Sequence, residues 1–204
     1  LYQGKLKGIT EKHLRQKGKN RKPKETRGKF LLGTPISKRP KEIKKRIFFG
    51  HYELDMMVSS RGKSKGCFAT FCEMKSRYFI ALKLSDRSSE SYGNAINRLL
   101  NIYPKTAFKS FTSDRGKEFS CYRNVEENYG IKFYFADPYS AWQRGSNENS
   151  NGLLREFYPK KTDLSEVNEK ELRLNLYLIN NRPRKCLGWK SAFEVFFNEL
   201  VQLI

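Results

Sequence analysis

Three acidic residues of this basic chain stand at positions where carboxylates can do chemistry. Asp55 lies inside a short apolar segment, between Leu54 and Met56, where a buried and unpaired carboxylate would cost free energy. Asp114 directly follows a second strand-like segment, and ligands of α/β proteins bind at the carboxyl ends of such strands. Glu148 comes after a further 33 residues, in the first turn of a predicted helix, where the helix dipole favours a negative charge.

Three carboxylates that converge on one point repel one another and need a cation to neutralise them. Mg²⁺ prefers oxygen ligands, and two such ions about 3.5–4 Å apart can activate a water or a 3′-hydroxyl in phosphodiester chemistry. Each of the three acids can also be a solvated charge or a partner in a salt bridge. The positions alone therefore leave a metal site and purely structural roles equally open.

The segments around these acids are predicted to form a sheet. Residues 51–58, 67–74 and 78–84 are short apolar and aromatic stretches bounded by Ser, Arg, Gly and Lys, which is typical of strands in an antiparallel meander. Apolar residues spaced by three and four predict a helix at 89–103, which Pro104 ends. The elements expected after it are a strand ending at 111–112, a helix at 117–129, a strand at 132–135 and a helix at 147–157.

Residues 172–179 alternate like a strand, but a capping box at Asn168 and Glu171 favours a helix there. The resulting order of elements predicts an α/β fold, with a mixed five-stranded sheet flanked by helices. Ser146 and Asn147 are the expected N-cap residues of the helix that carries Glu148.

The charge of the chain indicates a polyanionic partner. Lys and Arg number 41 against 21 Asp and Glu, a formal net charge of +20. An anionic membrane surface is the weaker alternative, because no stretch approaches the ~18–20 apolar residues of a membrane span and the chain starts without a signal-peptide pattern. Nucleic acid is therefore the expected partner.

The excess charge is concentrated at the start of the chain. Residues 1–50 hold 17 Lys or Arg and three Glu, a net of +14. Residues 17–29 contain no large apolar side chain to bury, which predicts an extended arm. We therefore divide the chain into a basic, largely extended arm or linker at 1–48 and a folded core at 49–204. We expect phosphate contacts from Lys17, Lys19, Arg21, Lys22 and Lys24 of this arm. The alternative is that the arm is only a solubilising tail.

Further candidates for DNA contact surround the third acid. Arg155 lies seven residues after that glutamate, on the same helical face, and could hold the DNA backbone instead of being merely solvated. Lys160 and Lys161 extend this basic edge. Trp142 and Arg144 precede the helix, and the indole could stack on an unpaired base or pack against the sheet.

The four cysteines do not form a zinc motif. Cys67 and Cys72 are near neighbours, but no second Cys or His pair stands at zinc-site spacing. We expect free thiols in a reducing cytoplasm.

Several long strings of this sequence resemble the catalytic core of bacterial insertion-sequence transposases of the IS-thirty family. The strings are FADPYSAWQRGSNENSNGLLR at 135–155 and INNRPRKCLGW at 179–189, with SDRGKEF at 113–119 and GHYELD at 50–55. The resemblance implies a ribonuclease-H-like fold for residues 49–204, shared with retroviral integrases. It also implies a DDE triad, with Asp55, Asp114 and Glu148 as catalytic residues and metal ligands.

The same resemblance implies an activity and its partners. The expected reaction is metal-dependent cleavage and transfer of DNA strands in insertion-sequence transposition, with two Mg²⁺ ions or Mn²⁺ in their place. Expected partners are the DNA of the element ends and of the target, with further copies of the chain, in the bacterial cytoplasm at the nucleoid. Two residues depart from the family: Arg115, where Asn is usual and which could pair with Asp114, and Tyr52, where Trp is usual.

The family's upstream helix-turn-helix region is not part of this sequence, so we expect a catalytic fragment or a decayed copy. Two other functions stay open beside the transposase. One is a non-catalytic nucleic-acid-binding protein, in which the acids would be interchangeable with Asn or Gln. The other is a ribonuclease-H-type nuclease that hydrolyses without joining strands, and it would share the same metal site.

Overall fold

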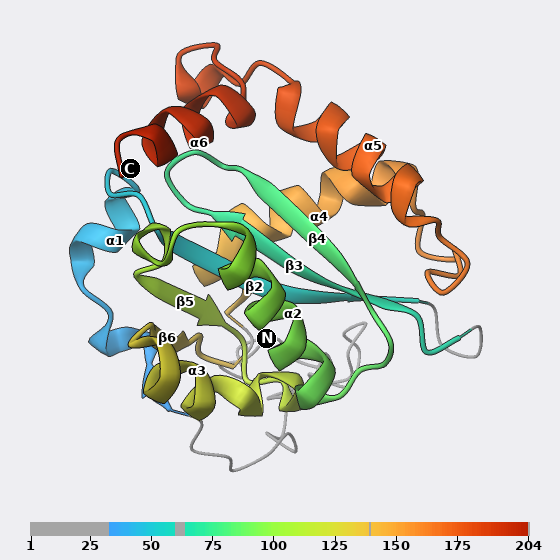
Figure 1. Cartoon of the computed structure of the whole chain (residues 1–204), viewed down its shortest axis with the longest axis horizontal. Helices are drawn as coiled ribbons and strands as arrows, with labels where there is room; N and C mark the ends of the chain where they lie inside the picture. Colours follow the sequence, from blue (N-terminus) through green and yellow to red (C-terminus); the bar gives the residue numbers. More distant parts are fainter. Residues whose placement is uncertain (1–32, 60–63, 139, 204) are drawn as a thin grey trace, which may run out of the picture. The chain divides into compact units, whose positions relative to one another are not determined.

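A computed structural model describes residues 33–59, 64–138 and 140–203 of the chain. Its centre is a mixed sheet with the strand order β1-β6-β5-β2-β3-β4 (Figure 1). The strands are β1 (Thr34–Pro35), β2 (His51–Val58), β3 (Cys67–Glu73), β4 (Phe79–Leu84), β5 (Ser110–Ser113) and β6 (Lys132–Phe135). The predicted mixed α/β fold is confirmed, with six strands in place of the predicted five.

The antiparallel meander was correctly predicted from the apolar segments. β2 pairs with β3 in a register that sets Asp55 opposite Thr70, and β3 pairs with β4. Every residue of β3 is buried, since helices cover both faces of this strand. β2 therefore lies deep in the sheet and holds Asp55 at a fixed depth.

The sixth strand comes from the segment that the sequence assigned to the arm. β1 pairs in parallel with β6, through Thr34 and Tyr134 and through Pro35 and Phe135. A short helix, α1 (Lys41–Lys45), follows it. Part of the predicted extended arm thus belongs to the sheet, whereas residues 1–32, with all the lysines and arginines proposed there, lie outside the described residues.

Helices cover the two faces of the sheet (Figure 1). α2 (Ser89–Ile102) and α3 (Tyr122–Tyr129) lie on one face, where they pack on an aromatic core that includes Tyr92, Phe111 and Phe133. α4 (Gly145–Phe157) and α5 (Glu169–Asn181) lie on the other face, over a second core around Phe68 and Tyr158. The last helix, α6 (Ala192–Val201), completes the first core with Phe196.

The bounds of several helices differ from the predicted ones, and α2 ends one residue before its predicted end. The helix expected at 117–129 is divided into a 3-10 helix at Lys117–Cys121 and α3. The ambiguous segment at 172–179 is helical and lies within α5, whose N-cap Asn168 accepts the N–H of Lys170. α4 begins at Gly145, two residues before its predicted start.

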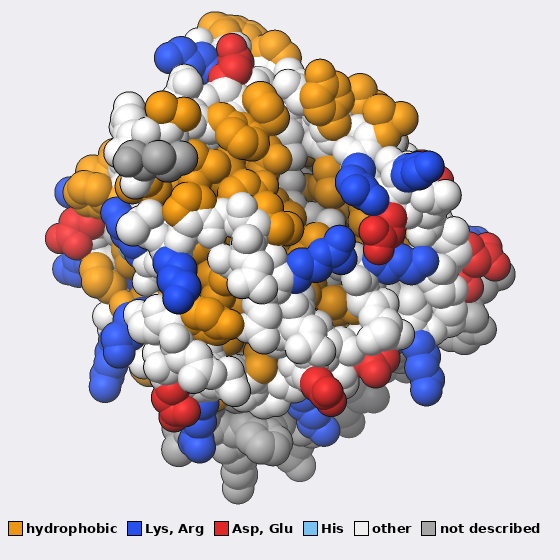
Figure 2. All heavy atoms as spheres, in the orientation of Figure 1, with side chains coloured by type: hydrophobic (Ala, Val, Ile, Leu, Met, Phe, Trp, Pro, Cys, Tyr) orange, Lys and Arg blue, Asp and Glu red, His pale blue; other side chains and the backbone are white. Residues whose placement is uncertain are grey.

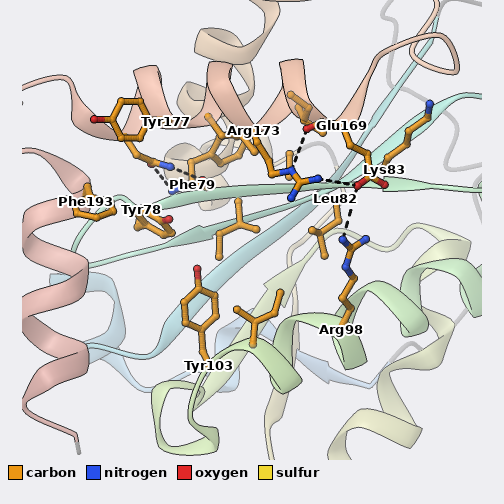
Figure 3. Close-up of a pocket in the computed structure, with 16 residues that line it drawn as sticks. Tyr78, Phe79, Leu82, Lys83, Arg98, Tyr103, Glu169, Arg173, Tyr177 and Phe193 are labelled. Atoms are coloured by element: carbon orange, nitrogen blue, oxygen red, sulfur yellow. Dashed lines mark hydrogen bonds and ion pairs between the residues drawn. The ribbon is translucent and has the colours of Figure 1, made fainter.

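The free edge of the sheet, β4, borders a groove of about 340 Å³. Figure 3 shows α5 above this edge and α2 below it, with Arg98 and Arg173 both directed toward Glu169. Asn180 of α5 binds the edge strand itself, because its amide accepts the N–H of Phe79 and donates to the Phe79 carbonyl. Apolar side chains gather on the same face of the molecule (Figure 2).

Candidate active site

Asp55 and Asp114 lie side by side because their strands are parallel neighbours. β2 and β5 pair with His51 opposite Ser110 and Glu53 opposite Thr112, and continuing this register sets Asp55 opposite Asp114. Asp114 is the first residue after β5, where its Oδ1 accepts the backbone N–H of Gly116 at 2.9 Å. The two acids therefore meet at one point of the sheet, as the sequence predicted.

A single guanidinium group joins the two acids. Arg144 Nη1 lies 3.3 Å from Asp55 Oδ1, and Arg144 Nη2 lies 3.2 Å from Asp114 Oδ2. Nη1 also donates to the Leu54 carbonyl at 3.1 Å, and only 12% of the Arg144 side chain is exposed. Burial lowers the pKa of Arg144, but the charges of the two carboxylates outweigh it and the pKa is raised.

This contact bears on two interpretations of the sequence. The guanidinium of Arg144 is engaged by the two acids, and its proposed contact with DNA stays a prediction. Arg115 was a possible partner of Asp114, but it lies 3.6 Å from Asp137 and donates from Nε to the Ala136 carbonyl. The cation beside the second acid thus comes from a residue 30 positions further along the chain.

Asp55 is held by further hydrogen bonds. Its Oδ1 accepts the N–H of Met56 at 3.0 Å, and its Oδ2 accepts from Asn151 Nδ2 at 2.9 Å. Burial raises the pKa of Asp55, Arg144 offsets part of this rise, and the charge of Asp114 adds to it. Asn151, whose role the sequence left undecided, is therefore the side chain that orients the first acid.

Glu148 lies on the same face of α4 as these contacts. Glu148, Asn151 and Arg155 follow one another at intervals of three and four residues, which places them along one stripe of α4, and Arg144 directly precedes this helix. Arg144 and Asn151 both bind Asp55, and Glu148 stands between these two residues in the sequence. Among the described residues, however, no three Asp, Glu, His or Cys side chains are close enough to hold a metal ion together. Convergence of the complete triad stays a prediction.

A buried polar network fixes α4 on the sheet and was not predicted. The Asn147 amide donates from Nδ2 to the Glu53 carbonyl, its Oδ1 accepts the Thr70 hydroxyl, and its backbone N–H binds the Glu53 carboxylate. All three side chains are at most 1% exposed. Burial raises the pKa of Glu53, partly offset by these backbone N–H groups. α4 has no side-chain N-cap from its own sequence, contrary to the prediction for Ser146 and Asn147. The Glu53 carboxylate accepts a backbone N–H of its first turn instead.

A fourth carboxylate, Glu118, lies near the acid pair. Burial raises its pKa, and so do the charges of Asp114 and Asp55, while Arg144 lowers it. Its carboxylate lies so close to Gly116 that a Cβ added there would stand 2.4 Å from Glu118 Oε2. A glycine at this position leaves room for the Glu118 side chain.

The other predicted DNA contacts differ in their surroundings. Arg155 donates from Nη2 to the Val58 carbonyl at 2.8 Å and from Nη1 to the Tyr158 carbonyl at 3.4 Å, and burial lowers its pKa. Trp142 is 74% exposed, so it does not pack against the sheet. Lys160 and Lys161 are exposed at the end of α4.

The acid pair fits a divalent metal ion. Asp55 and Asp114 offer carboxylate oxygens that already surround one cationic group, and hard oxygen donors of this kind suit Mg²⁺. In addition, Asn151 Oδ1 is buried and has no hydrogen-bond partner within the described chain. These observations support a cation site at the acid pair.

Comparison with known proteins defines the class. Residues 48–141 match the integrase core domain family. The catalytic core of bovine immunodeficiency virus integrase aligns with a TM-score of 0.59 at 19% identity, covering 76% of this chain and 98% of that one. A simian T-cell lymphotropic virus intasome chain aligns with a TM-score of 0.60 at 15% identity, over 72% of this chain and 54% of that one. The fold is thus the ribonuclease-H-like fold of retroviral integrase cores.

Sequence relatives define the family more closely. Transposase InsI of element IS30C from Escherichia coli is 38% identical over 92% of this chain and 49% of its own length. The probable transposase of IS1161 from Streptococcus salivarius is 39% identical over 84% of this chain and 48% of its own. The chain is thus similar over most of its length to transposases of the IS30 (IS-thirty) family, which confirms the predicted resemblance, and it spans about half the length of these relatives.

Two general features complete the description. Within the described ranges, no helix has the length and apolar character needed to cross a membrane. All four cysteines are free thiols, with Cys67 and Cys72 buried and Cys186 exposed.

Proposed function

We propose that this chain is the catalytic core of a DDE transposase that cuts DNA and joins the cut strand to a target by metal-dependent phosphoryl transfer. The observation that carries the proposal is the pairing of Asp55 and Asp114 around one cationic group, beside the helix that bears Glu148. In this proposal Asp55, Asp114 and Glu148 hold two Mg²⁺ or Mn²⁺ ions. Such ions, when bound, activate a water or 3′-hydroxyl and stabilise the departing oxygen.

The protein's own residues prepare this site. Asn151 holds one oxygen of Asp55, which leaves the carboxylate in a fixed orientation toward Asp114. The Glu53–Asn147 network holds the first turn of α4 against β2, so Glu148 cannot drift away from the sheet. Preorganised charges of this kind stabilise a transition state without reorganisation.

DNA is the proposed substrate, supported by the family, the net charge of +20 and the exposed indole ahead of Glu148. In this proposal Trp142 stacks on an unpaired base near the scissile phosphate, and Arg155, Lys160 and Lys161 contact the backbone. The basic arm contributes non-specific affinity. We further propose that the active form contains more than one copy of the chain and acts in the bacterial cytoplasm.

The test uses the protein with Mg²⁺ and a labelled DNA end from its own genomic flank. Glu148→Gln should lower the yield of nicked and joined products by at least about 100-fold, the scale on which one electrostatic stabiliser matters, and should leave duplex binding intact. Glu156→Gln is the matched control, because Glu156 is an exposed carboxylate of the same helix that pairs with Arg182. Equal activity of Glu148→Gln and wild type would refute the assignment of this acid. Nicked products without joined ones would favour the hydrolytic nuclease.

A further inference from the structure

A second cavity lies at the first turn of α4 and has a volume of about 340 Å³. Three arginines from separate parts of the chain line it: Arg46 after α1, Arg77 in the turn between β3 and β4, and Arg184 between α5 and α6. Ser146 and Asn149 of α4 complete its wall. Among the described residues that line it, no carboxylate is present.

The positive charge in this cavity is uncompensated by ion pairs. Within residues 33–59, 64–138 and 140–203, none of the three arginines forms a salt bridge. Arg77 donates from Nη1 to the Ser146 hydroxyl at 2.7 Å, while its Nε is buried without a partner in the same part of the chain. Burial lowers the pKa of Arg77, and the charge of Arg46 lowers it further. The fold therefore holds like charges together at a cost that an anion would offset.

The nearest alternative partner for these charges is Glu53. The charge of Glu53 raises the pKa of Arg77, and the charge of Arg46 lowers the pKa of Glu53. However, Glu53 is 1% exposed and its carboxylate already accepts the N–H of Asn147. Even with this one buried acid ionised, the three guanidinium groups keep a net positive charge.

From this arrangement we propose that the cavity binds a phosphate group. Guanidinium groups form paired, charge-assisted hydrogen bonds with phosphate oxygens, and the Ser146 hydroxyl and Asn149 amide add neutral donors. The phosphate can be part of a DNA backbone or free in solution. The proposed function favours the DNA backbone as the source of this phosphate. Only this choice of source rests on the proposed function.

The position of the cavity gives such a phosphate a use. Ser146 and Asn149 lie on the side of α4 opposite Glu148 and Asn151, at 3.6 residues per turn. The cavity and the side chains that bind Asp55 therefore lie on different sides of α4. A backbone phosphate held in the cavity fixes the register of the DNA relative to the acids without reading its sequence.

Two substitutions test the cavity without threatening the fold. Arg46 has a φ of 60°, a left-handed conformation that Asn adopts more readily than other side chains, so Arg46→Asn removes the charge and keeps the turn. Arg184→Gln removes the second charge. Arg173→Gln is the matched control, because this exposed arginine lies on α5 and contacts Glu169 instead of the cavity. Thermal unfolding in each case establishes that the variant is folded.

The first experiment measures duplex binding in EDTA over a range of salt concentrations, so no cleavage is needed. Arg46→Asn and Arg184→Gln should each flatten the log–log salt slope by ~0.9, the change for one lost phosphate contact, and weaken binding at low salt about tenfold. Arg173→Gln should leave the slope unchanged. Because Glu148→Gln should also leave it unchanged, failure of the proposed chemistry and failure of this inference give different results.

The second experiment compares thermal unfolding in inorganic phosphate and in chloride at the same ionic strength. Phosphate should raise the unfolding temperature of wild type and Arg173→Gln, and should raise it much less in Arg46→Asn and Arg184→Gln. Phosphate stabilisation with unchanged DNA slopes would overturn the assignment to DNA and leave a site for free phosphate. No stabilisation together with unchanged slopes would overturn the inference altogether.

Discussion

Replacing Arg144 by Gln should destabilise the protein in a way that Mg²⁺ reverses. The guanidinium lies 3.3 Å from Asp55 and 3.2 Å from Asp114, and it also binds the Leu54 carbonyl. Gln keeps much of the side chain's length and can still donate one hydrogen bond, but it carries no charge. The variant therefore leaves two neighbouring carboxylates without their shared cation.

The size of the effect follows from the exposure of the three groups. At an effective dielectric constant of about 20, each contact has a Coulomb energy of roughly 5 kcal/mol before desolvation is subtracted. Removing one partner of a buried pair costs about 3–5 kcal/mol, but Asp55 is 29% and Asp114 44% exposed, so water screens part of the loss. We expect Arg144→Gln to lower the free energy of unfolding by about 2–3 kcal/mol at neutral pH. The unfolding temperature should fall by about 5–10 °C.

The assay is urea unfolding of wild type and variant in EDTA and in increasing Mg²⁺. A divalent ion at the acid pair replaces the missing charge, so the stability deficit of Arg144→Gln should shrink as Mg²⁺ rises, and the variant should bind Mg²⁺ more tightly than wild type. Arg182→Gln breaks an exposed pair with Glu156 and should cost less than about 1 kcal/mol, with no response to Mg²⁺. A variant as stable as wild type, with the same Mg²⁺ response, would refute the view that Arg144 neutralises these acids.

Three other substitutions probe the surroundings of the site. Burial, with Lys109 and Arg39 nearby, lowers the pKa of His51 to about 4. Since the unfolded ring titrates near 6.5, wild type should lose stability as pH falls from 6.5 to 4, by at most about 3 kcal/mol, and urea unfolding of His51→Gln should lack this loss. Asn147→Ala should cost about 1–3 kcal/mol in the same assay, because it leaves the Glu53 carbonyl without the buried amide that donates to it. Arg155→Gln should weaken binding about equally for unrelated DNA sequences in a fluorescence titration, and a change in sequence preference alone would contradict a backbone contact.

Local patterns in the sequence were sufficient to predict most of the sheet. β2 and β6 were predicted with their observed bounds, since apolar runs between polar turn residues reflect burial directly. β1 could not be predicted in this way, because two residues, one of them Pro35, carry no periodicity and pair only once β6 is in place. α4 begins early for a similar reason, because its cap is supplied by Glu53 from another strand.

The acids of the site were predictable, whereas their partners were not. Asp55 and Asp114 could be recognised from their positions on strands, which fix the direction of a side chain. Nearness in sequence favoured Arg115 as the cation beside Asp114, but the chain turns away after the strand and directs Arg115 to Asp137. Arg144 reaches the pair from the start of α4, a contact that depends on how helix and sheet pack. Long-range pairing of this kind has no signal in a single sequence.

In the proposed metal site, the arginine between the two carboxylates serves folding before it serves chemistry. Without a cation, Asp55 and Asp114 would repel each other at the moment β2 and β5 pair, because the register of the two strands forces them together. Arg144 supplies the missing charge from within the chain, so the sheet can close in the absence of metal. The same contact means that a divalent ion must displace or share the guanidinium, which lowers metal affinity by the free energy of that contact. Movement of Arg144 toward a DNA phosphate would release both carboxylates together, and in this way binding of the substrate would favour binding of the metal.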